Sequence, residues 1–146
     1  MKLRLWVLAT LASVFASAAF AQAGRTYTEG PVMQVVSIDI TAGHFDEYMA
    51  YLASTWTKEQ EALKSAGLIL DYHIYSTLAG GPDSADVYLA TTYKNLAALD
   101  GFEERSSAVT NKALGNTPEA DMKGMAGRNS YRKVLGIELL RQLEIK

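Results

Sequence analysis

The amino-acid sequence predicts a single α+β domain with the element order β-α-β-β-α-β, preceded by an export signal. Three observations carry this prediction: an alternating, β-branched segment at 32–40, a helical apolar period across 43–66, and further alternating segments at 68–93 and 137–145. The chain has 146 residues, and the 125 or so that follow the signal suit one domain with one hydrophobic core.

Residues 1–21 have the composition of a cleavable secretory signal. Lys2 and Arg4 make a positive start, an apolar stretch follows, and Ala19-Phe20-Ala21 fits the small-x-small pattern of a cleavage site. A second cleavage register lies two residues later. The alternative is a membrane anchor, which needs about 20 apolar residues and would have to include the Ser/Ala-rich end of the segment. We expect cleavage after Ala21, a periplasmic location and no membrane association afterwards.

The domain is expected at 31–146, after a polar and flexible leader at 22–30. Residues 32–40 alternate and predict the first strand. In 43–66, apolar side chains recur at steps of three, four or seven, which places them on one face of a helix. Gly67 suits the position just beyond the end of that helix.

Residues 68–93 are typical of a hairpin. Leu70, Tyr72 and Ile74 form an apolar row that we expect to pack under the helices. The turn lies at 79–85, whose centre is Gly-Gly-Pro-Asp, and the partner strand follows it. Asn95 is expected to cap a short helix that ends at Leu99.

The segment 100–129 predicts an irregular crossover with helical stretches. One stretch should begin at Thr117-Pro118-Glu119, because proline favours the first helical position, whereas three glycines argue against a long helix. Residues 137–145 then alternate and predict the last strand. The resulting order is that of ferredoxin-like folds, with a four-stranded antiparallel sheet and both helices on one face.

The second face of this sheet is expected to be bare in one copy of the chain. Its side chains are too apolar to be left wholly in water and too polar for a dry core. We therefore expect a homodimer, in which two such faces enclose a partly wet cavity that holds a small apolar or aromatic ligand. Tyr75 and Tyr88 would stack on an aromatic ligand. The candidate ligand-binding residues are Ser37, Asp71, His73, Tyr75, Tyr88 and Thr92.

Composition excludes several classes of function. The chain has no cysteine, which rules out disulfides, thiolate zinc sites and a cysteine nucleophile. Cleavage of the signal would remove the basic residues Lys2 and Arg4 and no acidic residue, so the net charge of the chain would change from −2 to −4. The sequence contains no cluster of Lys and Arg that would indicate a nucleic-acid partner. His44 and His73 lie on different elements at no metal-binding spacing, so we predict no metal site and no cofactor.

The strand at 32–40, the helix start Gly-His-Phe-Asp-Glu-Tyr at 43–48 and the hairpin resemble the dimeric α+β barrel superfamily. This superfamily includes NIPSNAP-like proteins, stress-responsive barrel proteins and small cofactor-free monooxygenases. The resemblance covers Val32–Leu99 and, more loosely, Tyr131–Ile145. It implies paired sheets that hold a hydrophobic or aromatic molecule, or haem, between them. The segment 100–129 departs from the simpler crossover of the small monooxygenases, and no catalytic residue is carried over.

Two functions follow from these patterns. The first is a periplasmic small-molecule-binding or structural protein. The alternative is a cofactor-free oxygenase or isomerase that acts in the same cavity, with His73 as base and Tyr75 or Tyr88 orienting the substrate. A histidine that is merely hydrogen-bonded within the sheet is a third reading of His73. No known catalytic motif occurs in the chain, which favours the first function.

Overall fold

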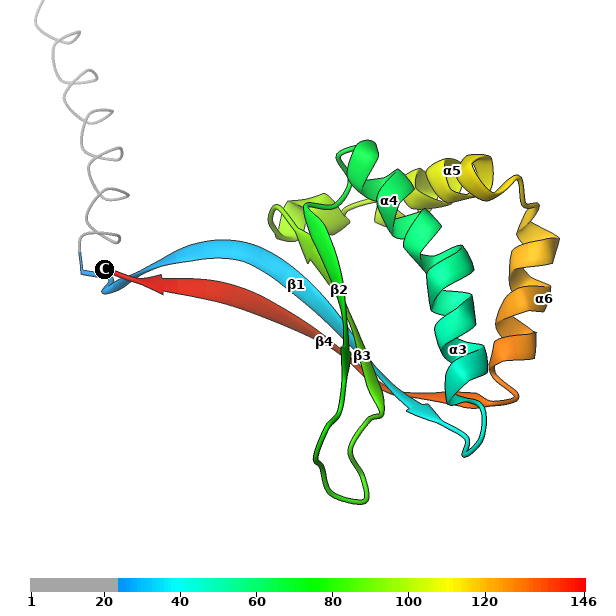
Figure 1. The fold of residues 1–146 in the computed structure, drawn as a ribbon. Helices are drawn as coiled ribbons and strands as arrows, with labels where there is room; N and C mark the ends of the chain where they lie inside the picture. The colour runs from blue at the N-terminus through cyan, green and yellow to red at the C-terminus, as the bar shows by residue number, and fades with distance from the viewer. Residues whose placement is uncertain (1–23) are drawn as a thin grey trace, which may run out of the picture. The chain divides into compact units, whose positions relative to one another are not determined.

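The computed structural model describes residues 24–146, so the predicted export signal lies outside the described residues. The described chain divides into two compact units, Gly30–Gln142 and a small unit of residues 24–29 with 143–146. The elements in chain order are β1 (Tyr27–Ile40), α3 (Phe45–Tyr51), the π-helix η1 (Leu52–Trp56), α4 (Thr57–Ser65), β2 (Asp71–Ser76), β3 (Val87–Tyr93), the 3₁₀-helix η2 (Leu96–Leu99), α5 (Phe102–Leu114), α6 (Pro118–Arg128) and β4 (Arg132–Ile145) (Figure 1).

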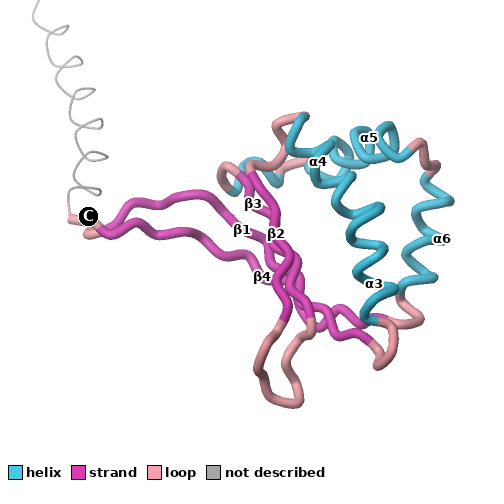
Figure 2. The backbone as a smooth tube through the Cα atoms, viewed as in Figure 1, coloured by secondary structure: helices cyan, strands magenta, loops and turns pink. Residues whose placement is uncertain are grey.

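The four strands form one sheet in the order β2-β3-β1-β4. Strand β3 is antiparallel to both of its neighbours, with Val36 opposite Leu89 and Ile74 opposite Leu89. The helices lie to one side of the strands in the larger unit (Figure 2). This arrangement confirms the predicted ferredoxin-like α+β fold.

The first crossover is a continuous helical run from Phe45 to Ser65, as predicted, except that one turn in its middle is a π-helix. The run ends in a Schellman motif: the amide of Leu68 donates to the carbonyl of Leu63, and the amide of Gly67 donates to the carbonyl of Lys64, both at 3.0 Å. Gly67 has φ +70°, the left-handed conformation that glycine adopts without strain. The sequence signal at Gly67 is therefore confirmed.

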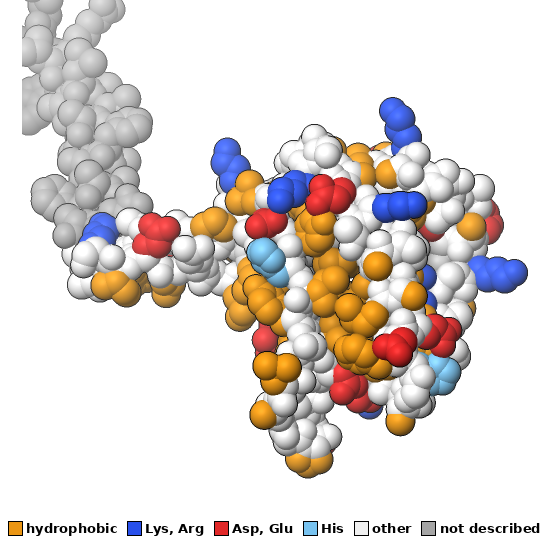
Figure 3. Space-filling view, in the orientation of Figure 1, with side chains coloured by type: hydrophobic (Ala, Val, Ile, Leu, Met, Phe, Trp, Pro, Cys, Tyr) orange, Lys and Arg blue, Asp and Glu red, His pale blue; other side chains and the backbone are white. Residues whose placement is uncertain are grey.

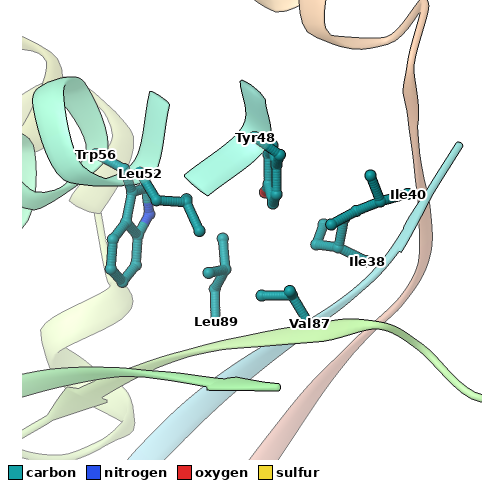
Figure 4. Close-up of a cluster of buried hydrophobic side chains, with 7 residues drawn as sticks. All are labelled: Ile38, Ile40, Tyr48, Leu52, Trp56, Val87 and Leu89. Carbon is teal, nitrogen blue, oxygen red and sulfur yellow. The ribbon is translucent and has the colours of Figure 1, made fainter. Parts of the chain in front are cut away.

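The hydrophobic core lies between this helical run and the sheet. Ile38 and Val87 are 1% and 0% exposed, and Tyr48 and Leu52 of the helical run are both 0% exposed. Strand alternation brings one face of β1 and β3 under the helix, where each fully buried aliphatic side chain contributes about 1.5–3 kcal/mol. The buried cluster consists of Ile38, Ile40, Tyr48, Leu52, Trp56, Val87 and Leu89 (Figure 4).

One member of the expected core row is misplaced. Leu70 is 47% exposed, whereas Ile69 is 3% exposed and packs with Leu63 and Tyr93. The reason is that β2 begins only at Asp71, so the strand alternation does not extend back to Leu70. Tyr72 and Ile74 do pack against the core as expected. In the space-filling view, hydrophobic side chains gather along the seam between β2 and the helical run (Figure 3).

The second crossover is more regular than the sequence indicated. It consists of α5 and α6, joined by three residues, and Gly115 ends α5 with φ +66°. The hydroxyl of Thr117 accepts a hydrogen bond from the amide of Ala120 at 3.3 Å, which confirms the predicted helix start. Gly124 lies inside α6, although glycine there costs about 1 kcal/mol relative to alanine. Before these helices, Asn95 caps η2 as predicted, accepting from the amide of Ala98 at 3.1 Å.

The first and last strands of the chain, β1 and β4, are longer than their sequence patterns. β1 starts at Tyr27, so Tyr27–Gly30 of the segment expected to be a flexible leader belong to a strand. β4 starts at Arg132, five residues before the predicted strand. In the small unit, the amide of Lys146 donates to the carbonyl of Thr26 at 2.9 Å. No helix among residues 24–146 is both long and apolar enough to cross a membrane.

Candidate functional site

The sequence-predicted site residues share the sheet face that points away from the helices. Their positions alternate with those of the core residues Ile38, Val87 and Leu89. We call this surface the open face. The antiparallel register puts the predicted site residues in two rows across the sheet. One row holds Ser37, Tyr88 and Tyr75, with Tyr88 opposite both of the others. The other row holds Asp71 opposite Thr92, and His73 lies between the rows.

Polar contacts on the open face centre on Asp71. One carboxylate oxygen accepts from Nζ of Lys64 at 2.8 Å, and the other lies 3.3 Å from Nε2 of His73. The hydrogen bond from Lys64 is the main reason that the pKa of Asp71 is lowered. The side chains of His73 and Asp71 are 54% and 46% exposed in one copy of the chain. A ligand-binding role for these residues stays a prediction.

A second site, not expected from the sequence, lies on the opposite side of the sheet. It is a cavity of about 660 Å³ between the sheet and the helices of the larger unit, and we call it the helix-side cavity. Its floor includes Val36 and Leu89, and Val134 of β4 extends it. Its apolar wall residues come from the helical run, α5 and α6, and are Tyr51, Trp56, Phe102 and Met125.

Two arginines lie at one end of the helix-side cavity. The Cζ atom of Arg128, at the end of α6, is 4.1 Å from the ring centroid of Tyr51. Arg132, at the start of β4, donates from Nη1 to the hydroxyl of Tyr48 at 2.9 Å. Among the described residues, the Nε atoms of both arginines are buried and have no hydrogen-bond partner. Such atoms are uncommon in folded proteins.

Burial around these arginines shifts neighbouring groups toward their neutral forms. It raises the pKa of Tyr51 to about 12, although both arginines oppose the shift. Burial likewise raises the pKa of Tyr48, against the opposing effect of Arg132. Glu59, one of the acids that line the cavity, also has a raised pKa because of burial, and Arg128 opposes this. The phenols are therefore hydrogen-bond donors at neutral pH rather than counter-ions for the arginines.

The other end of the helix-side cavity is polar. Gln60 accepts from the hydroxyl of Thr91 at 3.3 Å, and Asn116 donates to the carboxylate of Asp121 at 3.0 Å. Ser106 and Thr110 of α5 complete this end. The cavity thus has a cationic end, an apolar middle and a polar end. The carboxylate of Asp121 at the polar end accepts a hydrogen bond from the side-chain amide of Asn116.

The π-helix turn η1 forms part of the wall. It spans Leu52–Trp56, and both Thr55 and Trp56 line the cavity. A π turn inserts an extra residue into a helix and occurs frequently at functional sites. Nothing in the local sequence distinguishes it from an ordinary helical turn, so the sequence pattern predicted one regular helix here.

No sequence pattern pointed to this cavity. Arg128 and Arg132 are separated from Tyr48 and Tyr51 by about 80 positions, and only the packing of α6 over the helical run brings them together. The segment 100–129 was expected to be an irregular crossover with helical stretches, so the start at Thr117 was predicted but not the packing of that helix. Within residues 24–146, no group of three or more histidine, aspartate or glutamate side chains is arranged to hold a metal ion.

Comparisons with known proteins yield fold resemblance only. No protein-family model matches the chain, and no curated protein matches it. Two solved structures are similar, each described as a dimeric ferredoxin-like protein from an uncultured marine organism. The first has a TM-score of 0.49 and 12% identity, covering 81% of this chain and 90% of that one. The second has a TM-score of 0.46 and 14% identity, covering 82% and 98%.

Proposed function

We propose that this chain is a periplasmic, homodimeric small-molecule-binding protein of the dimeric α+β barrel type, whose ligand occupies the helix-side cavity. The observation that carries the proposal is the cavity itself. Its volume of about 660 Å³ lies within the range of about 300–1,000 Å³ that is common for small-molecule sites. Its apolar middle with a few convergent polar groups is also the usual lining of such sites.

The open face serves in this proposal as the surface between two copies of the chain. Leu135, Ile137 and Leu139 alternate with Val134, which lines the helix-side cavity, so they lie on the open face. They are 42%, 60% and 53% exposed. A second copy would cover these side chains together with the predicted residues Ser37, Tyr75, Tyr88 and Thr92. An apolar ligand between the two copies, as first predicted for those residues, is compatible with this pairing.

Trp56 provides a direct test of ligand binding. It is the only tryptophan that follows the predicted cleavage site, and it lines the cavity. We expect the neutral fluorophore N-phenyl-1-naphthylamine to bind and to quench Trp56 fluorescence by energy transfer. Val134→Phe should fill part of the cavity and weaken binding by about tenfold or more. Leu135→Phe is the matched control, because its side chain lies on the open face.

Two results would count against the helix-side cavity as the binding site. One is the absence of any quenching of Trp56 with the folded wild-type protein. The other is an equal loss of binding in Val134→Phe and Leu135→Phe, or a loss confined to Leu135→Phe. The last outcome would favour the open face, where the alternative function, a cofactor-free oxygenase or isomerase with His73 as base, would operate. The 3.3 Å pair of His73 with Asp71 is the observation that favours this alternative.

Export is tested separately. We expect intact-mass measurement of secreted protein to give a chain that starts at Gln22. Secreted material that still carries Met1–Ala21 would contradict the proposed cleavage.

A further inference from the structure

Resting on the proposed function, the geometry points to an aromatic carboxylic acid as the ligand class, with the carboxylate bound by Arg128 and Arg132 and the rings in the apolar middle of the helix-side cavity. The inference depends on four features of the larger unit: the fixed positions of the two arginines, their lack of a counter-ion, the room around them, and the lining next to them.

The positions of the two arginines are fixed by backbone contacts. Three residues join the end of α6 to β4, and the amide of Tyr131 donates to the carbonyl of Arg128 at 3.2 Å. The carbonyl of Tyr131 accepts from the amide of Thr41 at 2.9 Å, which ties this connection to the end of β1. Figure 1 shows α6 beside α3 at this end of the domain. The backbone that carries both arginines is therefore tied to the end of β1.

Aromatic rings, and not acids, hold the guanidinium groups. Arg128 stacks on Tyr51 at 4.1 Å, and Arg132 lies 5.5 Å from the ring centroid of Tyr48. Among the described residues, no carboxylate lies within ion-pair distance of either arginine. Glu59 is the acid that acts electrostatically on Arg128, but it makes no ion pair with the guanidinium group. Two part-buried cations without a counter-ion are costly, and an anionic ligand removes that cost.

The chain leaves room for Arg128. A Cβ atom added at Gly124 would lie 3.1 Å from Nη1 of Arg128, closer than most side-chain contacts. Glycine at this position of α6 therefore permits the guanidinium group to lie along the helix. The planar fork of a guanidinium matches a carboxylate in two parallel hydrogen bonds, and both arginines line the helix-side cavity.

The apolar middle explains why the acid should be aromatic. Trp56, Met125 and Val134 line the cavity beyond the arginines, and Phe102 lies further along. From Tyr51 to Gln60 the helical run advances nine residues, which is about 13 Å at 1.5 Å per residue. That length accommodates a carboxylate followed by two fused rings, and Trp56 and Met125 both make favourable contacts with ring faces and edges.

The test compares two probes that share the naphthalene rings and carry either an anionic or a neutral oxygen substituent. 2-Naphthoate is an aromatic carboxylate, and 2-naphthylmethanol carries a neutral hydroxyl on the same rings. In calorimetric titrations of the wild-type protein at pH 7, we expect the acid to bind about tenfold more tightly than the alcohol or better. Arg128→Gln and Arg132→Gln should each weaken naphthoate binding by about tenfold or more and leave binding of the alcohol within about twofold. Lys133→Gln, on the open face beside Arg132, is the matched control and should change neither.

The outcomes separate the inference from the proposed function. Equal affinities for acid and alcohol in the wild-type protein, both lost in Val134→Phe, would overturn the inference and leave the proposed cavity intact. Binding of neither probe, nor of N-phenyl-1-naphthylamine, would overturn both. A charge preference that Lys133→Gln abolishes and the two arginine variants retain would also overturn the inference. The wild-type comparison needs no variant, so a variant that fails to fold does not prevent the test.

Discussion

The two faces of the sheet are built from the same strands and yet differ in almost every physical property. Ile38 is 1% exposed under the helical run, while Ser37, its neighbour in β1, lies on the open face. The helix side holds the buried core and a cavity lined by two arginines, whereas His73, Tyr75 and Ile137 on the open face are each more than half exposed. Strand alternation places successive side chains on opposite faces of the sheet, and the face that the helices cover forms the core.

The largest expected effect of a single substitution is on the helix side. Ile38→Ala should lower the free energy of unfolding by about 2–5 kcal/mol, because it opens a cavity in a closely packed cluster. Ser37→Ala should change it by less than about 0.5 kcal/mol. Urea unfolding of both variants measures the difference. Equal losses would mean that the two faces are equally buried in the folded protein, and the distinction between them would fail.

Dimerisation provides the next largest effect, this time on the open face. We expect wild-type protein to sediment as a dimer at tens of micromolar, and Ile137→Asp to raise the dimer dissociation constant by about 100-fold or more. The reason is that an unpaired carboxylate would be buried between the two sheets. Glu138→Gln, at the neighbouring position of β4, should leave the dimer intact. A wild-type monomer at this concentration would refute the pairing of open faces.

The tyrosines provide a comparison that depends on pH. Burial raises the pKa of Tyr51 from 10 to about 12, so the folded state retains a proton that the unfolded state loses above about pH 10. The stability that this contributes is complete below pH 10 and is lost as the pH rises toward 12. Tyr51→Phe should flatten this part of the stability profile, measured by urea unfolding between pH 9 and 12. Tyr75→Phe, which removes a hydroxyl from the open face, is the matched control, and an identical flattening by both would contradict the prediction.

The smallest predicted effect concerns the anchoring of α6 over the helix-side cavity. Thr117→Ala removes the side-chain acceptor for the amide of Ala120 and should lower the free energy of unfolding by about 1 kcal/mol. Hydrogen exchange should become faster in the first turn of α6 and stay unchanged in β2 and β3. Thr117→Ser keeps the acceptor and should preserve wild-type protection. Faster exchange across the whole sheet would show that α6 is required for the core itself.

Elements with local sequence signals could be predicted from the amino-acid sequence. The alternation at 32–40, the helical period at 43–66, Gly67, Asn95 and Thr117 each act through contacts within about four residues, and the structure bears each of them out. The placement of Asp71, His73 and Tyr75 away from the helices follows from the same alternation. Such signals are strong because a cap or a period stabilises its own element whatever the rest of the chain does.

The helix-side cavity, in contrast, depends on contacts between segments that are distant in the chain. Arg132 donates a hydrogen bond to the hydroxyl of Tyr48, 84 positions away, and Arg128 stacks on the ring of Tyr51. An arginine at the end of a helix has the same sequence signature whether it faces water or a buried tyrosine. The choice between these environments is made when α6 docks on the helical run, because burial and hydrogen bonding between distant segments outweigh the local preferences of either segment.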